Sequence, residues 1–309
     1  MGDIAILIPY FNPVGYRSHL SKLSQTLQAF GQAGLADDVF LVGAGPWRPP
    51  WANIAFWDEE CPFLWHKVRL LNIGVRGLPD SYTHVIWADS DILVGPDWWP
   101  AVRAAFRQAP IVQCFTSIVY LTDAGPLPRV RPSALCPGAG GAAGVCWGAE
   151  RSLFSSGPGL FELALVGAGD SIFATELLGE NQLPSVPWLP DHPALLYQTW
   201  PGPLIARMDQ WRAAARDWTQ GKKAVAAQAV VEVITHGPNR ARRYFDRQSL
   251  LAHMDPSRHL VDDPGRVLRW SADGLAEVEP GIRAYFHQRR EDDAMTGQVS
   301  REAVSTTGR

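Results

Sequence analysis

Two aspartates interrupt an apolar stretch in the first third of the chain. The segment His84–Trp99 reads HVIWADSDILVGPDWW, so one apolar run precedes Asp89 and Asp91 and a second follows them. Short apolar runs of this kind are typical of buried strands. Burying two like charges is unfavourable unless a positive group neutralises them. The segment therefore predicts a strand that ends at two carboxylates, which should bind a cation or a ligand that carries one.

Strands and helices alternate on both sides of this segment. Apolar runs predict strands at 4–9, 39–42, 54–57, 84–88 and 111–120, and helical signals predict helices at 18–30, 65–74, 97–107, 160–165, from 170 and at 203–218. The alternation is typical of a parallel sheet with crossover helices. We therefore expect an α/β fold with a Rossmann-like, mostly parallel central sheet and helices on both faces. Ligands bind at the carboxyl edge of such sheets, where Asp89 and Asp91 are expected to lie.

Two local features complete this picture. Ser18 is the expected N-cap of the first helix, because serine side chains accept hydrogen bonds from the free N–H groups there. Residues 121–145 are rich in Pro, Gly and Ala and are expected to form a long loop, and such loops in compact domains are often functional.

Composition narrows the class of protein. The chain has 309 residues, 46% of them hydrophobic, which is enough for one large domain or two fused halves. The formal net charge of -3 does not favour a nucleic-acid partner. We see no signal peptide, and no apolar run approaches the ~20 residues of a membrane span. The four cysteines show no CxxC spacing, so we expect a cytoplasmic protein with reduced cysteines and no membrane span.

An Asp-x-Asp pair at a strand end suits Mg²⁺ or Mn²⁺, because these ions take carboxylates together with substrate phosphate oxygens. The plain alternative is a loop with an N-capping aspartate. Haloacid-dehalogenase-like phosphotransferases also use Asp-x-Asp, but on their first strand, whereas several strands precede it here. Nucleotidyltransferases on related folds need a Gly-rich loop after the first strand, and YFNPVGYR at 10–17 lacks those glycines.

Five blocks of sequence, in order along the chain, resemble one family of enzymes. They read ILIPYFNP (6–13), KVRLLNIGVRGLP (67–79), WADSDILV (87–94), WGAERSLF (147–154) followed by LVGAGDSIFA (165–174), and ITHGPNRARRYFDR (234–247). Together they resemble the GT-A type nucleotide-sugar glycosyltransferases, family 2-like, over roughly residues 6–250. The chain departs from that pattern at Gly169-Asp170, where the family has a Glu-Asp pair.

The resemblance implies a GT-A fold in a single domain of residues 1–290. A nucleotide-sugar half would span about 1–120 and an acceptor half about 121–290, with 291–309 as a disordered tail. It also implies a metal-dependent glycosyltransferase of the hexosyltransferase type, with a UDP-sugar as donor, Mn²⁺ or Mg²⁺ as cofactor and a sugar or glycan as acceptor. Inverting transfer is expected, although a retaining outcome stays open. The alternative is a catalytically silent GT-A module that binds a sugar or nucleotide.

The resemblance also implies roles for the charged residues. Asp91 would bind the metal directly, and Asp89 would bind ribose or metal-bound water. His236 is a candidate third metal ligand, since imidazole suits Mn²⁺, and a structural histidine is its alternative. Asp170 is the candidate general base that takes the proton of the acceptor hydroxyl. An N-cap of the following helix is an alternative or additional role for Asp170.

The donor pocket has five further candidates. Pro9, Tyr10 and Phe11 are expected to line the pocket for the base through backbone and ring contacts. Lys67 and Asn72 are expected to lie near the nucleotide. Because they are five residues apart on a helix, they do not share a face.

The acceptor side has three candidates. Trp147 is expected to stack on a sugar ring, with core packing as its alternative. Gly167 and Gly169 would let the backbone approach the acceptor closely. At most one member of the basic run is expected to meet the diphosphate, and this run consists of Arg240, Arg242, Arg243 and Arg247.

Overall fold

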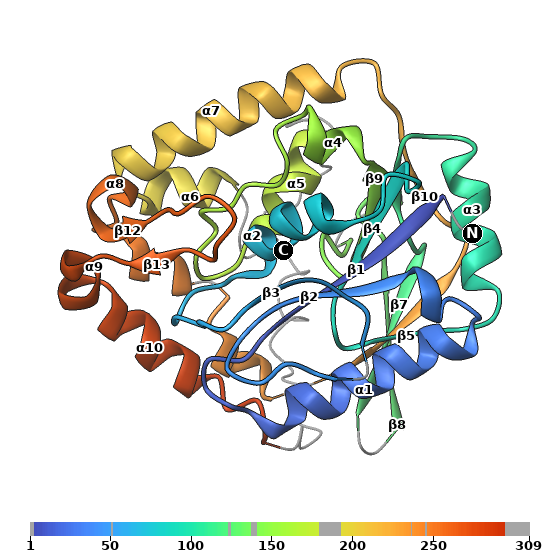
Figure 1. Ribbon diagram of the computed structural model, residues 1–309, viewed down its shortest axis with the longest axis horizontal. Helices are drawn as coiled ribbons and strands as arrows, with labels where there is room; N and C mark the ends of the chain where they lie inside the picture. The colour runs from blue at the N-terminus through green and yellow to red at the C-terminus, as the bar shows by residue number, and fades with distance from the viewer. Residues whose placement is uncertain are drawn as a thin grey trace, which may run out of the picture.

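A seven-stranded sheet forms the centre of the described part of the molecule (Figure 1). The computed structural model describes residues 3–50, 52–122, 125–136, 141–178, 193–235, 237–244 and 246–293. In spatial order the sheet contains β10 (Ala224–Ala226), β6 (Ile111–Gln113), β9 (Cys146–Glu150), β4 (His84–Ala88), β1 (Ile4–Phe11), β2 (Val39–Ala44) and β3 (Ile54–Asp58). β9 runs antiparallel to β4 and β6, and the other neighbouring pairs are parallel. The predicted α/β class with a mostly parallel central sheet is confirmed.

Helices and smaller sheets surround the central sheet. The α-helices of the described residues are α1 (Arg17–Gln32), α2 (Lys67–Gly74), α3 (Trp98–Phe106), α4 (Ser152–Ser155), α5 (Gly169–Leu178), α6 (Pro193–Thr199), α7 (Gly202–Thr219), α8 (Pro256–His259), α9 (Ala272–Glu277) and α10 (Glu279–Gln288). A second sheet contains β5 (Ile92–Val94), β11 (Val230–Ile234), β7 (Ser117–Thr122) and β8 (Gly125–Pro132), and β12 (Leu260–Val261) pairs with β13 (Arg269–Trp270). Figure 1 shows α1 and α7 on opposite sides of the molecule.

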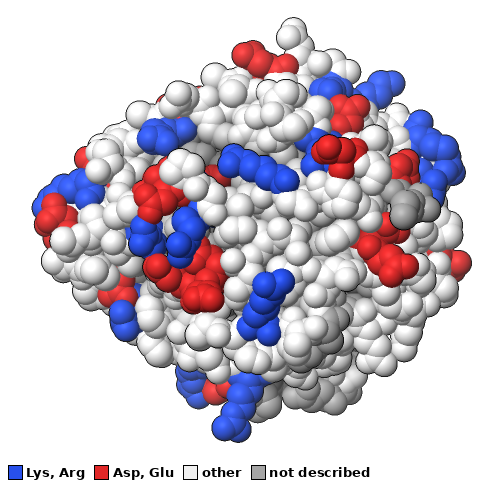
Figure 2. Space-filling model, in the orientation of Figure 1, with Lys and Arg blue, Asp and Glu red and all other residues white. Residues whose placement is uncertain are grey.

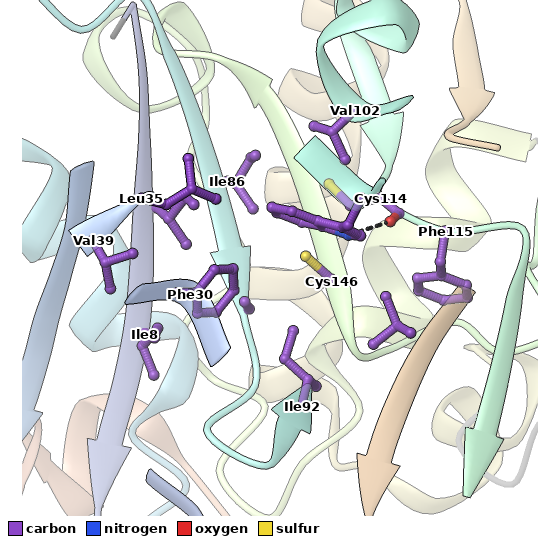
Figure 3. Packing of buried hydrophobic residues seen from close by; sticks show 14 of the residues in the cluster. Ile8, Phe30, Leu35, Val39, Ile86, Ile92, Val102, Cys114, Phe115 and Cys146 are labelled. Atoms are coloured by element: carbon purple, nitrogen blue, oxygen red, sulfur yellow. Dashed lines mark hydrogen bonds between the residues drawn. The ribbon is translucent and has the colours of Figure 1, made fainter. Parts of the chain in front are cut away.

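Alternating side chains of β1 enter two cores, one on each face of the central sheet. Ile6 and Ile8 pack in a core with side chains of α1 and α3, whereas Leu7 packs in a core with side chains of α2 and α5. This alternation is the two-residue period of a strand that is buried on both faces. Figure 3 shows the first core, with Ile8 on its strand and with Phe30 of α1 and Val102 of α3 pointing into it.

A third core lies in the C-terminal half of the chain. Side chains of α6, α7 and α10 pack there with residues of the 160–168 segment, among them Leu196, Leu204, Tyr285 and Phe286. The residues from 250 to 290, for which the sequence indicates no chemical role, therefore belong to the folded body.

The predicted elements differ from the structure in three places. The predicted strand 111–120 is divided between β6 and β7, because the chain leaves one sheet after residue 113 and joins the other. Part of the predicted loop 121–145 is β8, an edge strand, which is where prolines are tolerated in sheets. No helix forms at 160–165, because the Asn72 side chain bonds the backbone N–H and C=O of Leu160.

The surface carries interspersed charges. On the face shown in Figure 2, acidic and basic side chains lie close to one another and large areas carry neither. None of the described helices has the length and the apolar character that crossing a bilayer requires.

The N-terminus of α1 is capped by a residue from the other end of the chain. The Asp292 carboxylate accepts hydrogen bonds from the backbone N–H groups of Arg17, at 3.1 Å, and Ser18, at 2.8 Å. Ser18 is therefore not the N-cap, and its hydroxyl donates instead to the Glu291 carbonyl. Residues 291–293 of the expected tail pack against α1, and 294–309 lie outside the described residues.

We expect Asp292→Ala to lower the free energy of unfolding by about 1 kcal/mol, because it leaves two N–H groups at the start of α1 without their acceptor. Urea unfolding measures the change. Asp293→Ala is the matched control, because among the described residues the Asp293 carboxylate pairs only with the exposed Arg290 of its own segment. Equal stabilities of the two variants would contradict the capping role.

Candidate active site

Three chain segments meet at the carboxyl edge of the central sheet. β4 ends at Ala88, directly before Asp89, while α2 begins at Lys67 and α5 carries Asp170 in its first turn. The side chains of Lys67, Asp89 and Asp170 are in contact, so this is the point at which the three segments converge.

The Lys67 ammonium bridges the two carboxylates. Its Nζ lies 2.6 Å from Asp89 Oδ1 and 2.7 Å from Asp170 Oδ2. The Lys67 side chain is 8% exposed, whereas those of Asp89 and Asp170 are 31% and 26% exposed and so can reach a ligand. Within the described residues neither carboxylate accepts any other hydrogen bond. Asp170 is therefore bonded to Lys67 rather than to the backbone as an N-cap.

The charges in this site shift each other's protonation. Burial raises the pKa of Asp89 to about 6, and the opposing effect of Lys67 does not cancel this rise. The neighbouring carboxylates of Asp170 and Asp91 add to the increase. Burial acts to lower the pKa of Lys67, but Asp170 and Asp89 outweigh it and the pKa of Lys67 is raised. Lys67 thus remains a cation that bonds to two carboxylates.

The oxygen donors at this edge fit a divalent cation. The Asp91 carbonyl accepts a hydrogen bond of 2.8 Å from Ile234 N, which places Asp91 beside the end of β11. His236, the candidate third ligand, lies outside the described residues. Within the described ranges no group of three or more His, Cys, Asp or Glu residues could hold a metal. Asp89 and Asp91 nevertheless offer hard oxygen ligands, which suit Mg²⁺ or Mn²⁺ completed by phosphate oxygens.

A second buried lysine lies near Asp91, and the sequence analysis missed it. Lys22 on α1 is 8% exposed, and its ammonium makes no hydrogen bond or ion pair with any of the described residues. Burial lowers the pKa of Lys22, while Asp91 and Glu291 act to raise it. The available signal was helical spacing, because Lys22 shares the buried side of α1 with Thr26 and Ala29.

Two members of the predicted basic run surround Tyr244. Arg242 Nη1 donates to the Tyr244 hydroxyl over 2.8 Å, and the Arg247 guanidinium lies 4.8 Å from the ring centroid. Burial acts to raise the pKa of Tyr244, but Arg242 and Arg247 outweigh it and the pKa is lowered. Arg242 also interacts electrostatically with Asp91, so this member of the run lies on the side of the site where a diphosphate is expected.

The three residues predicted to line the base pocket differ in exposure. Pro9 and Tyr10 are buried, and the Tyr10 ring stacks on Trp57 with centroids 6.3 Å apart. Phe11 is half-buried, and its ring lies edge-on to Trp65 at 5.1 Å. Phe11 therefore keeps an accessible ring at the end of β1, whereas the Tyr10 ring belongs mainly to the core.

Asn72 holds the polypeptide rather than an open site. Its amide nitrogen donates to the Leu160 carbonyl at 2.8 Å and to Glu162 Oε1 at 2.7 Å, and its oxygen accepts from Leu160 N at 2.9 Å. The side chain is buried and engaged on both ends. This arrangement assigns Asn72 to fixing the turn before α5, so we do not retain it as a nucleotide ligand.

Trp147 has no surface to offer a sugar. It is fully buried, donates from Nε1 to the Ala143 carbonyl at 2.7 Å, and lies edge-on to Phe173 of α5. The structure contradicts the predicted sugar contact of Trp147, and core packing, its alternative, is the observed role.

Gly167 and Gly169 allow close packing at the start of α5. A Cβ on Gly169 would lie 2.7 Å from Val68 Cγ2, and one on Gly167 would lie 2.8 Å from Arg247 Nη2. Gly167 also has a φ of +106°, a conformation that glycine adopts without strain. Both glycines thus bring the α5 N-terminus against α2 and Arg247, which positions Asp170.

Two other residues near the site adopt strained backbone conformations. Val145 has a φ of 84°, and its carbonyl accepts a hydrogen bond of 2.9 Å from Asp89 N. Ala168, two residues before Asp170, has a φ of 92°. Positive φ is unfavourable for both residues, especially for β-branched Val145. Strain of this kind is concentrated at functional sites.

The chain was compared with known proteins. It matches no family model and no curated protein. Among similar solved structures is S. aureus TarS 1-349, with 11% identity and a TM-score of 0.40 over 56% of this chain and 54% of that one. A second is the catalytic domain of Drosophila beta1,4galactosyltransferase 7, with 14% identity and a TM-score of 0.33 over 56% of this chain and 60% of that one. A third is a putative glucose-1-phosphate thymidylyltransferase from Bacillus anthracis, with 8% identity and a TM-score of 0.36 over 82% of this chain and 96% of that one. The chain thus spans about half the length of the TarS structure. At these identities and TM-scores the likeness carries no conclusion about activity, which has to be argued from the site.

His66, directly before α2, is buried and neutral. It is 1% exposed and its Nε2 lies 2.9 Å from the Pro62 carbonyl, so the neutral ring donates this hydrogen bond. Burial lowers the pKa of His66 from 6.5 to about 4. Because the unfolded chain binds this proton at a higher pH than the folded one does, the stability associated with His66 is complete above pH ~6.5 and is lost as pH falls towards 4.

Replacing His66 should therefore reduce the acid sensitivity of the fold. Between pH 7 and pH 4 we expect the free energy of unfolding to fall by on the order of 3 kcal/mol more in the wild type than in His66→Gln. Urea unfolding at both pH values measures the difference. His253→Gln, at an exposed position, is the control and should show the wild-type fall. The same fall in His66→Gln would contradict the effect of burial.

Gly167→Ala should destabilise the fold by roughly 1–3 kcal/mol, because φ is positive there and the new methyl group would approach the Arg247 guanidinium. Gly31→Ala is the control, since a Cβ there would meet nothing within 4 Å and alanine favours the helical conformation of α1. Thermal unfolding compares the variants. A Gly167→Ala variant as stable as Gly31→Ala would contradict the close packing at α5.

Proposed function

We propose that this chain is a metal-dependent glycosyltransferase that transfers a hexose from a UDP-sugar to a hydroxyl of a sugar or glycan acceptor, with inversion at the anomeric carbon. The observation that carries the proposal is the pair of partly exposed carboxylates, Asp89 and Asp170, that one buried lysine holds together at the carboxyl edge of a parallel sheet. One of them follows a central strand beside Asp91, and the other begins a helix. In this proposal Asp89 belongs to the donor side and Asp170 to the acceptor side.

Asp91 and Asp89 would hold Mn²⁺ or Mg²⁺, and His236 is retained as a proposed ligand. When bound, the cation would offset the negative charge of the departing diphosphate. Phe11 and the backbone of 9–11 would contact the base, and Arg242 lies where it could approach the diphosphate. Apart from His236, which lies outside the described residues, these assignments extend the resemblance in the sequence to residues near one edge of the sheet.

Asp170 would act as the general base. Its Oδ2 is bonded to Lys67, whereas Oδ1 accepts no hydrogen bond from the described residues and can accept a proton. The acceptor hydroxyl would give its proton to Asp170 while its oxygen bonds to the anomeric carbon. The bond from that carbon to the diphosphate breaks, and the nucleoside diphosphate leaves from the opposite face.

Thermal unfolding in the presence of UDP, GDP, CMP or TDP, each with and without Mn²⁺, tests the donor side. Binding to the native state at 100 times Kd should stabilise the protein by about 2.7 kcal/mol. We expect this effect with UDP, dependent on Mn²⁺ and absent in Asp91→Ala. No stabilisation by any nucleotide would overturn the proposed function.

Asp170→Asn tests the acceptor side and is the matched control for Asp91→Ala. It should keep the Mn²⁺-dependent effect of UDP but lose transfer by at least about 100-fold, the usual contribution of a general base. Near-normal transfer by this variant would exclude Asp170 as the base. Nucleotide binding without transfer to any of a broad panel of acceptors would instead favour a silent nucleotide-binding module.

A further inference from the structure

Lys67 connects two carboxylates that have different partners in the proposed reaction. Asp89 belongs to the donor side, and Asp170 belongs to the acceptor side. In the structure the same Nζ is within 2.7 Å of both, and within the described residues it is the only hydrogen-bond donor to either carboxylate. Any change at Asp89 therefore reaches Asp170 through one shared group.

The position of Lys67 is unfavourable without these carboxylates. It is the first residue of α2, where the partial positive charge of the helix N-terminus repels a cation. It is also nearly fully buried, and a buried charge needs a partner. The other buried lysine near this edge, Lys22, interacts electrostatically with Asp91 and not with Asp170. The link between the two sides of the site is thus specific to Lys67.

A divalent cation at Asp89 would change this balance. A metal ion and an ammonium at one carboxylate repel each other, and the doubly charged ion is the stronger competitor for its oxygens. The flexible stem of lysine allows its ammonium to shift by a small distance while the helix stays in place. Asp170, which is outside the expected ligand set of the metal, would then be the remaining partner of Lys67.

We propose that Lys67 is a positioning residue that couples donor binding to the catalytic base. With a metal and a diphosphate held by Asp89 and Asp91, Lys67 would leave Asp89 and hold Asp170 alone in the orientation that receives the acceptor. This inference rests on the proposed function. It implies that the donor binds before the acceptor, because only after the donor has bound does Lys67 pair with Asp170 alone.

The shared bridge can be tested without any ligand, by thermal unfolding of Asp89→Asn, Asp170→Asn and the double variant. Each single change leaves Lys67 one carboxylate and removes the repulsion between the two, whereas the double change leaves a buried ammonium without an anion. We expect the fall in Tm of the double variant to exceed the sum of the single falls.

The matched control combines Asp89→Asn with Glu162→Gln. Glu162 pairs with Arg69, which lies on α2 as Lys67 does, and Glu162 shares no partner with Asp89. The falls in Tm caused by these two changes should be additive. If the falls in Tm caused by the Asp89 and Asp170 changes are also additive, Lys67 does not link the two carboxylates energetically and the proposal is overturned.

The donor-linked release can be tested by determining the structure with Mn²⁺ and UDP bound. We expect Lys67 Nζ to remain within hydrogen-bond distance of Asp170 and to be outside that distance from Asp89. Lys67 that stays with Asp89, or that leaves Asp170, would overturn the coupling. A purely structural lysine would not move.

The outcomes distinguish this inference from the proposed function. If the protein does not bind Mn²⁺ and UDP, the metal-dependent function and the donor-linked release both fail, and the bridge is still decided by the unfolding cycle. If it binds both and Lys67 does not move, the function stands and the coupling fails. Lys67→Arg, which keeps the charge, should retain more transfer activity than Lys67→Met does.

Discussion

One ammonium shared by two carboxylates is the interaction on which the site depends. Lys67, Asp89 and Asp170 come from α2, the end of β4 and the start of α5, so the contact fixes three elements relative to one another at the carboxyl edge of the sheet. Gly167 and Gly169 allow α5 to come close enough for this contact. Two residues with positive φ also lie beside these carboxylates: Val145 accepts a hydrogen bond from Asp89 N, and Ala168 precedes Asp170 by two residues.

The site concentrates unfavourable features that the rest of the fold tolerates. A carboxylate with a pKa raised to about 6 is less stable in its ionised form than it would be in water. Two further unfavourable features are Lys67 at the N-terminus of α2 and the positive φ of Val145. A fold that only needed stability would have apolar side chains and ordinary turns at these places. Such features are concentrated at functional sites.

The sequence predicted what depends on local pattern. The predicted strands match β1, β2, β3 and β4, and the predicted helices match α1 and α7, whereas β9 and β10 were not predicted. Asp89 and Asp170 are both predicted site residues. The contact of Lys67 with Asp170 was not predicted, because the two are 103 positions apart and no local pattern records it. Trp147 and Asn72 were misjudged for the same reason, since burial and partners are properties of the tertiary structure.

The contact between Asp292 and the start of α1 has a consequence for how the protein is made. α1 is formed early in synthesis, but its cap becomes available only after residue 292 has left the ribosome. Until then α1, the first crossover helix of the central sheet, has a frayed end. Long-range closure of this kind is slow compared with helix formation. The start of α1 would therefore reach its final stability only after most of the chain has been synthesised.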